Sequence, residues 1–238
     1  MASKGLIPVA NYADAFSQAN ENPLSSSGVW TGGYTSQNSL EVVSNSARAT
    51  AIGPQSLMTY NGFVPTPQQY AQFELGLWSV GAGEEVLIGV ALRMAASPTF
   101  DGYTVMLGGS GASSRTMQTH RWTAGSPTLL ATSAEITVVS GDVFSGYARG
   151  PSIFAYQNGI LCTSASDATY PTGRVGLCCD VTLATTAASI KNFGGGDIAA
   201  IERSGLSRFS TPILLDEDDG RFDDLDVRNW WKSRVEFA

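Results

Sequence analysis

The sequence predicts an all-β fold, built as a two-sheet antiparallel sandwich or jelly roll. Short runs of β-branched and aromatic residues recur along the chain, with turn residues between them about every ten residues. Residues 141–177 show this most clearly, because strand and turn signals follow one another there with no room for a helix. The body of the chain also lacks a sequence repeat and an amphipathic helical pattern, so nothing competes with the all-β prediction.

The stretch 141–177 predicts a hairpin between two short strands. Residues 153–156 read as the first strand and residues 160–162 as its partner. Between them stands Asn158-Gly159, a dipeptide that tolerates positive φ at both central positions of a two-residue turn. Residues 144–148 and 173–177 are expected to add further antiparallel strands.

Two longer segments alternate with period 2, which is a strand signal. In the first, one face carries Phe73, Leu75 and Leu77, and the opposite face carries Gln72, Glu74 and Trp78. In the second, one face carries Val86, Ile88, Val90, Leu92 and Met94, backed by Gly89, Ala91 and Arg93. Further strands are expected at 40–43, 48–52, 57–60, 103–107, 117–122, 129–132, 135–139 and 189–193.

Length, composition and net charge limit the classes of protein to which this chain can belong. The 238 residues suffice for one large all-β domain or two small ones. Hydrophobic residues make up 43% of the chain and charged residues only 15%, which suits a sheet protein and not a disordered one. The net charge of −7 excludes a nucleic-acid partner, because phosphate binding needs clustered Lys and Arg.

Charge density divides the chain near residue 197. Residues 1–197 hold 12 acidic and 8 basic residues, whereas residues 198–238 hold 9 and 6. We therefore expect an N-terminal lead at 1–10, one sandwich at 11–197 and a C-terminal arm at 198–238. The N-terminus lacks the apolar run of a secretory signal, and no later segment is long enough to span a bilayer. These features predict a protein made and kept in the cytoplasm until assembly.

The cysteines predict neither a disulfide framework nor a zinc site. Cys178 and Cys179 are adjacent and would pair only with strain, and Cys162 is left over. Their spacing matches no zinc motif. We expect them to be small buried hydrophobic residues in strands.

Several segments carry a family resemblance in a consistent order. They are the opening with Asp14, Phe16, Pro23, Leu24, Trp30 and Thr31, the middle at 89–93 and 102–103, the hairpin with Asp167 and 173–177, and the close at 190–197. Across residues 11–197 the chain resembles the concanavalin A-like lectin/glucanase sandwiches of the laminin-G-like type. That resemblance implies a jelly-roll fold of the kind found in bacterial carbohydrate-active proteins and in bacteriophage virion proteins.

The sequence lacks the residues for hydrolysis. Glucanases of this superfamily use a Glu-x-Asp-x-x-Glu or Glu-x-Asp-x-Glu run on one strand, and no such run exists here. The pair Glu84-Glu85 lies in a turn, and the remaining candidates are solitary: Asp101, Glu135, Asp142, Asp167 and Asp180. His120 is the only histidine of the sequence. The sequence has no nucleophile-elbow motif whose serine or cysteine His120 could activate. We therefore predict that the protein is not an enzyme.

Sugar binding remains open, because aromatic rings offer flat faces on which pyranose rings stack. The candidates are Trp30, Tyr34, Trp78, Tyr103, Trp122, Tyr147 and Tyr156. Most aromatic residues of a sandwich belong to its core, and Trp30 is expected to plug it. The predicted glycan-binding set is Trp78, Tyr103, Trp122 and Tyr156.

The C-terminal arm is the main functional clue, because exposed apolar residues mark interfaces. Its candidate partner-binding residues are Phe209, Leu214, Leu215, Phe222, Trp230 and Trp231. The arm either docks onto a neighbouring subunit, which we favour, or packs on its own sandwich. A calcium site from Asp216, Asp218 and Asp223 is a further hypothesis, although the register of this acidic stretch fails the EF-hand pattern. No other cofactor is expected.

These observations give a leading prediction and two alternatives. The leading one is a non-enzymatic structural or decoration protein of a bacteriophage-like virion, which forms an oligomer through its termini. The first alternative is a carbohydrate-binding, lectin-like module for a cell-surface glycan, and the second is a glycan hydrolase. The virion step is an analogy, since a fold does not determine a function.

Overall fold

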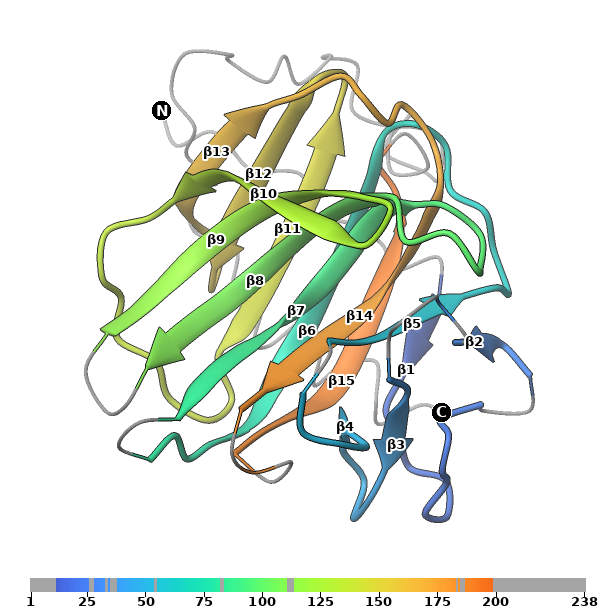
Figure 1. The fold of residues 1–238 in the computed structure, drawn as a ribbon, viewed down its shortest axis with the longest axis vertical. Coiled ribbons are helices and arrows are strands. Elements are labelled where there is room, and N and C mark those ends of the chain that lie inside the picture. The colour runs from blue at the N-terminus through green and yellow to red at the C-terminus, as the bar shows by residue number, and fades with distance from the viewer. Residues whose placement is uncertain are drawn as a thin grey trace, which may run out of the picture.

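The computed structural model describes residues 12–25, 28–32, 34, 38–53, 55–81, 84–110, 114–182, 184 and 187–198. Within them the chain forms two antiparallel sheets that pack face to face, as the sequence predicts. In Figure 1 the seven-stranded sheet lies in front of the eight-stranded one. The predicted lead at 1–10 lies outside the described residues, and so does the predicted arm after Ile198.

The eight-stranded sheet brings together strands from both ends of the described chain. Its order is β13 (Ile160–Ser166), β12 (Ser152–Gln157), β11 (Val143–Arg149), β6 (Gln69–Trp78), β15 (Ala188–Asp197), β4 (Ala47–Ala49) and β3 (Leu40–Val42), with β1 (Tyr12–Asp14) also paired to β15. The late strand β15 therefore lies beside the early strand β6, which joins the beginning of the domain to its end.

The seven-stranded sheet is built mostly from the middle of the chain. Its order is β10 (Ser126–Thr132), β9 (Ser114–Thr123), β8 (Gly102–Ser110), β7 (Glu85–Met94), β14 (Arg174–Val181), β5 (Ser56–Tyr60) and β2 (Trp30–Thr31). The insertion of β14 between β7 and β5 is a crossover typical of a jelly roll, not of a simple meander.

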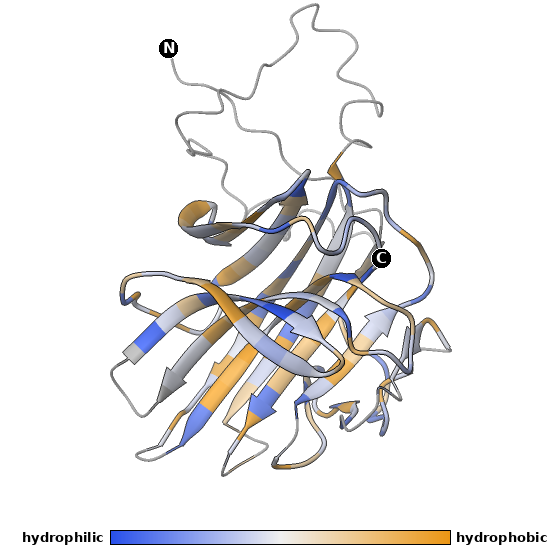
Figure 2. Cartoon of the chain, turned by 45° about the horizontal axis from the view of Figure 1, so that its top comes forward, coloured by the Kyte–Doolittle hydropathy of each residue, from blue (hydrophilic) through white to orange (hydrophobic). Residues whose placement is uncertain are grey.

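The core lies between the sheets and follows the predicted alternation. Phe73 of β6 stacks on Phe144 of β11 with ring centroids 5.4 Å apart, and both are fully buried. Val90 and Leu92 of β7 face them from the other sheet. Hydrophobic residues accordingly concentrate along the central strands, while several strand ends are hydrophilic (Figure 2). Burial of these apolar faces is the main force that holds the sheets together.

The hairpin predicted at 153–162 is confirmed. Asn158 and Gly159 connect β12 to β13 with φ of 52° and 81°, so both central turn residues are left-handed. Asn158 also anchors the turn, because its side-chain oxygen accepts a hydrogen bond from the backbone N–H of Val143 at 3.0 Å.

The opening motif forms a plug at one end of the core. Trp30 is 3% exposed, and its indole N–H donates to Asp14 Oδ2 at 2.8 Å. Its ring lies 4.9 Å from that of Phe193 in β15 and 6.2 Å from that of Phe16. The prediction that Trp30 plugs the core is confirmed, and Asp14 satisfies its one polar atom.

The predicted face of Leu77 is wrong, because β6 and β15 are bulged where they pair. Leu75 pairs with Ile190 and Leu77 with Ser189, so Gly76 is an extra residue on β6. A one-residue insertion reverses every side chain beyond it. Leu77 therefore points outward and is 44% exposed, while Trp78 packs against the core.

Met94 is likewise on the opposite face from the one predicted. Arg93 adopts a left-handed φ of 48°, which reverses the alternation at the end of β7. Leu92 belongs to the main core, but Met94 packs with Ala91 in a second cluster on the outer face of the seven-stranded sheet.

The same irregularity buries Arg93 and creates a junction between the sheets. The Arg93 side chain is 1% exposed, and its Nη2 and Nη1 atoms donate to the carbonyls of Pro67 at 2.6 Å and Gly150 at 2.8 Å. The Gln69 side chain accepts from the Arg93 N–H at 2.8 Å and donates to the carbonyl of Gly173 at 3.2 Å. These bonds tie β6 to β7 and to the segment before β14.

Two other predicted strands need correction. Residues 135–139 form no strand, because they belong to the loop that passes from β10 in one sheet to β11 in the other. The strand expected at 48–52 begins and ends earlier, at Ala47–Ala49, and Ile52 is 51% exposed.

The cysteines form no disulfide. Cys178 and Cys179 are buried in β14 and Cys162 is half-buried in β13. Burial raises the pKa of the Cys179 thiol to about 12, so this side chain is a neutral hydrophobic group, as predicted. No helix among the described residues is long and apolar enough to cross a membrane.

Candidate functional site

The four aromatic residues predicted to bind glycans do not gather at one surface. Tyr103 is fully buried in the core, and Trp122 and Tyr156 are 7% and 4% exposed on the outer faces of different sheets. Trp78 packs against the core, with the guanidinium carbon of Arg115 6.0 Å from its ring. These rings therefore do not form a shared stacking platform within the described part of the chain.

The outer face of the seven-stranded sheet is filled by its own side chains. Trp122 stacks on Phe100 with ring centroids 4.5 Å apart, and its indole N–H donates to Thr104 Oγ1 at 2.9 Å. Met106 and Cys178, which lie on the same face, are fully buried. These side chains form a second hydrophobic cluster on the outer face of the sheet. The rings of Phe100 and Trp122 are therefore buried and not presented to a ligand.

His120 lies on this face but is poorly placed for catalysis. Its ring is half-buried and lies 6.3 Å from that of Trp122. Burial lowers its pKa, so the imidazole is neutral at physiological pH. Its Nδ1 atom has no hydrogen-bond partner among the described residues, and hence no carboxylate there orients it as a base.

Asp167 is not the solitary turn acid that the sequence suggests. Its carboxylate accepts hydrogen bonds from the Tyr103 hydroxyl at 2.7 Å, Arg121 Nη1 at 2.8 Å and the Thr169 N–H at 2.8 Å. Burial alone would raise its pKa, but these donors outweigh burial and lower the pKa to about 2. The Asp167 carboxylate thus connects the segment after β13 to strands β8 and β9, which is a structural role.

We expect Asp167→Asn to lower the free energy of unfolding by about 1–2 kcal/mol at pH 7. Because the folded-state pKa is depressed, this stabilisation is present above the unfolded pKa of about 4 and is lost as the pH falls toward 2. Urea unfolding of both proteins across this range measures it. The stability difference should shrink with acid, whereas Glu135→Gln, at an exposed residue, should show no such trend.

Asp180 is also not isolated. Its pKa is raised, first by burial and then by the negative charge of Glu85 on the neighbouring strand β7. The two acids come from different strands at one end of the seven-stranded sheet, and not from the single-strand run that glucanases use. The negative charge of Glu85 thus disfavours ionisation of Asp180.

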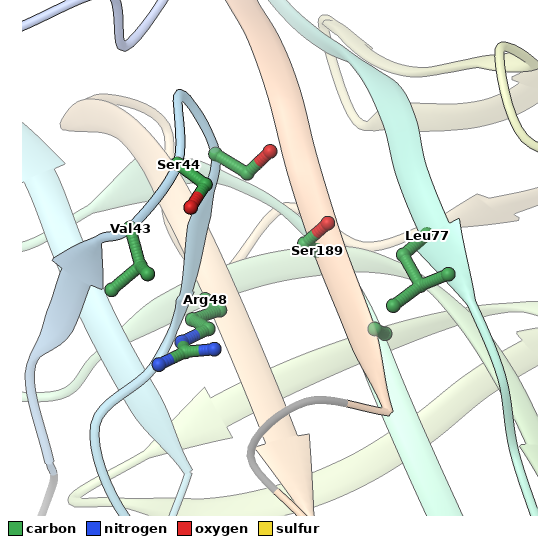
Figure 3. Close-up of a pocket in the computed structure, with 7 residues that line it drawn as sticks. Val43, Ser44, Arg48, Leu77 and Ser189 are labelled. Carbon is green, nitrogen blue, oxygen red and sulfur yellow. The ribbon is translucent and has the colours of Figure 1, made fainter.

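A shallow depression lies on the outside of the eight-stranded sheet, between β4, β15 and β6. Its volume is about 230 Å³, and it is lined by Val43, Ser44, Ser46, Arg48, Leu77, Ala188 and Ser189. Figure 3 shows Leu77 and Ser189 on the two central strands and Arg48 with Ser44 on the β3–β4 hairpin.

The chemistry of this depression combines one apolar surface with several hydrogen-bonding groups. Leu77 supplies the exposed apolar surface, and Arg48 is oriented by a 2.8 Å ion pair between its Nε atom and Glu41 Oε1. No hydrogen bond within the described residues uses the hydroxyls of Ser44, Ser46 or Ser189. The lining contains no Asp, Glu, His or Cys, so it can bind a polar ligand but offers no acid, base or nucleophile.

The sequence does not reveal this depression, for two local reasons. The bulge at Gly76 exposes Leu77, which alternation assigns to the core. The β3–β4 turn also has left-handed residues, with φ of 51° at Ser44 and 59° at Asn45. Asn45 was the available signal for that tight turn, because Asn tolerates positive φ.

The described part of the structure does not test the predicted calcium site. Within them, no three His, Cys, Asp or Glu side chains lie close enough together to hold an ion. The predicted calcium ligands Asp216, Asp218 and Asp223 and all the predicted partner-binding residues lie outside the described ranges. Both remain predictions.

Comparison with known proteins gives matches only at the level of structure. No family model and no curated protein matches the chain. The carbohydrate binding module CBM66 from Bacillus subtilis is 12% identical with a TM-score of 0.50, over 71% of this chain and 92% of its own. A legume lectin-like domain from Entamoeba histolytica is 11% identical with a TM-score of 0.50, over 75% and 95%.

An enzyme is among the similar structures as well. An endo-acting O-glycanase of the human gut microbiota is 10% identical with a TM-score of 0.54, over 79% of this chain and 99% of its own. Binding modules and hydrolases thus share this architecture, so the architecture does not decide between them. The chain has the concanavalin A-like jelly-roll fold that its opening, hairpin and closing strand predict.

Proposed function

We propose that this chain is a non-catalytic carbohydrate-binding domain, and that the depression between β4, β15 and β6 holds one sugar ring. The main support is the lining of the depression, which combines three serine residues and Arg48 with the exposed Leu77. A pyranose presents an apolar C–H face and a rim of hydroxyls, which suits such a surface. Structural similarity to a carbohydrate binding module and a lectin-like domain supports the proposal.

The absence of acid–base groups from the lining separates binding from hydrolysis. Glycoside hydrolysis needs two carboxyl groups on either side of the scissile bond. The lining has none, and Glu41, the acidic residue that contacts the lining residue Arg48, is paired with its guanidinium. We therefore propose that the bound sugar is held and released unchanged.

Glycan binding is expected on an array of bacterial, algal and animal oligosaccharides. Leu77→Glu fills the depression with a charged side chain and should abolish binding, whereas Ser189→Ala should weaken it about fivefold, the effect of one lost hydrogen bond. The matched control is Leu129→Glu, since Leu129 is 54% exposed on the other sheet. Titration calorimetry on an array hit gives the affinities. Wild-type protein that binds no glycan, or binding that survives Leu77→Glu, contradicts the proposal.

The predicted virion role is compatible with sugar binding and remains a prediction. None of the similar structures named above is a virion protein. Co-purification of the full chain with assembled particles would support that role.

A further inference from the structure

A row of tyrosines crosses the outer face of the eight-stranded sheet, at the opposite end of β6 from the depression. Tyr70 of β6 pairs with Tyr147 of β11, and their rings stack at 5.7 Å. Tyr156 of β12 continues the row, 5.2 Å from Tyr147. Their strand neighbours, such as Ala71 and Ala148, lie in the core, so alternation places all three rings on the outside.

Most of these outward-facing groups are buried, and Tyr147 is half-buried. Tyr70 is 0% exposed, Tyr156 4% and Gln72 3%, although they lie on the solvent side of the sheet. The Tyr70 hydroxyl and Gln72 Nε2 are buried and have no hydrogen-bond partner within the described part of the chain. Buried polar groups in native proteins are nearly always paired. This face therefore calls for a covering segment that supplies polar partners.

The strand beside the row, β15, contributes glycines to this part of the sheet. Gly196 and Gly194 of β15 pair with Tyr70 and Gln72, so no side chain from β15 flanks the first ring. Aromatic residues suit this surface, because ring pairs stabilise one another beyond their burial.

The described part of the chain ends beside this row. Asp197 pairs with Gln69, and the Ile198 N–H donates to the Gln68 carbonyl at 2.9 Å, one strand from Tyr70. Residues 199–238 follow, and they include Phe209, Phe222, Trp230 and Trp231. The row spans three adjacent strands, which is about 10 Å, and a few extended residues cover that distance.

We propose that residues 199–238 fold back in cis over the tyrosine row, with the tryptophan pair Trp230-Trp231 against the rings. The arm is attached at the edge of the row, which gives it a far higher effective concentration than a second copy of the chain can reach. Docking also removes two adjacent tryptophans from water, where they would form an exposed apolar patch. This inference does not depend on the sugar site.

Photo-crosslinking of the full chain tests the proposal. Phe154 lies in β12 on the same face as Tyr156 and is half-buried, so Phe154→p-benzoylphenylalanine places a photoprobe on the row with little disturbance. Irradiation should join this residue to a peptide from 199–238 at the mass of a single chain, with a yield that does not change on dilution. Crosslinks between two chains, crosslinks confined to residues 12–198, or no crosslink would overturn the proposal.

Two controls make the result specific. The same probe at Leu129, exposed on the other sheet, should give no crosslink to the arm. The double substitution Trp230→Ala and Trp231→Ala should reduce the Phe154 crosslink severalfold, and Leu77→Glu should leave it unchanged.

A second measurement needs no change in the sandwich. The arm contains tryptic sites at Arg221, Arg228 and Lys232. They should be cleaved slowly in the wild-type chain and rapidly in the double tryptophan variant. Equal rates would overturn docking through the tryptophans, independently of any result on glycans.

Discussion

Gly173→Ala is expected to lower the free energy of unfolding by about 3–5 kcal/mol. Gly173 has a φ of +147°, a conformation that residues with a side chain rarely adopt. An added Cβ would also lie 2.3 Å from the carbonyl carbon of Arg93, and backbone cannot move aside as a flexible side chain can. Urea unfolding followed by tryptophan fluorescence measures the loss.

Gly150→Ala is the matched control. Gly150 also has a positive φ, +55°, but an added Cβ would meet nothing within 4 Å. Its cost should be limited to the conformational penalty of about 1–2 kcal/mol. If both variants lose the same stability, the close approach of Gly173 to Arg93 is not what constrains that residue.

Arg93→Met is expected to lower the free energy of unfolding by about 2–4 kcal/mol. Methionine fills similar space but leaves the carbonyls of Pro67 and Gly150 buried without their donors. Part of this cost is offset, because burial of a guanidinium is itself unfavourable and lowers its pKa. Chemical denaturation gives the difference.

Arg93→Lys should not restore the stability, because one ammonium cannot reach carbonyls on both sides of the junction as the planar guanidinium does. The exposed Arg149 of β11 is the control, and Arg149→Met should be nearly neutral. A rescue by lysine would mean that charge, and not the spread of donors, stabilises this end of the sandwich.

The sequence predicts the regular part of this fold well, because the governing signals are local. The Asn158-Gly159 turn, the alternation of Phe73 and Leu75, and the burial of Trp30 all follow from a few neighbouring residues. The order of strands in the sheets does not follow from such signals, since it depends on contacts between distant segments. The family resemblance implied a two-sheet jelly-roll sandwich without an order of strands, and the structure confirms that sandwich.

The candidate site was far less accessible from sequence. The predicted glycan-binding set rests on residue type, and residue type alone does not distinguish a buried Tyr103 from an exposed ring. The network of Asp167 joins residues that are 46 and 64 positions away in the chain, at Arg121 and Tyr103. The depression depends on a bulge at Gly76, which alternation cannot show, because a glycine carries no side chain to assign to a face.

The extra residue at Gly76 has a consequence for how this chain is compared with others. Because Leu75 pairs with Ile190 and Leu77 with Ser189, a strand one residue shorter would present the same side chains to the same faces. Two chains of this fold can therefore share core and surface along this strand while differing in length. An alignment without a gap at this place would match outward residues of one chain with inward residues of the other from Leu77 onward. Length, more than residue identity, decides the correspondence there.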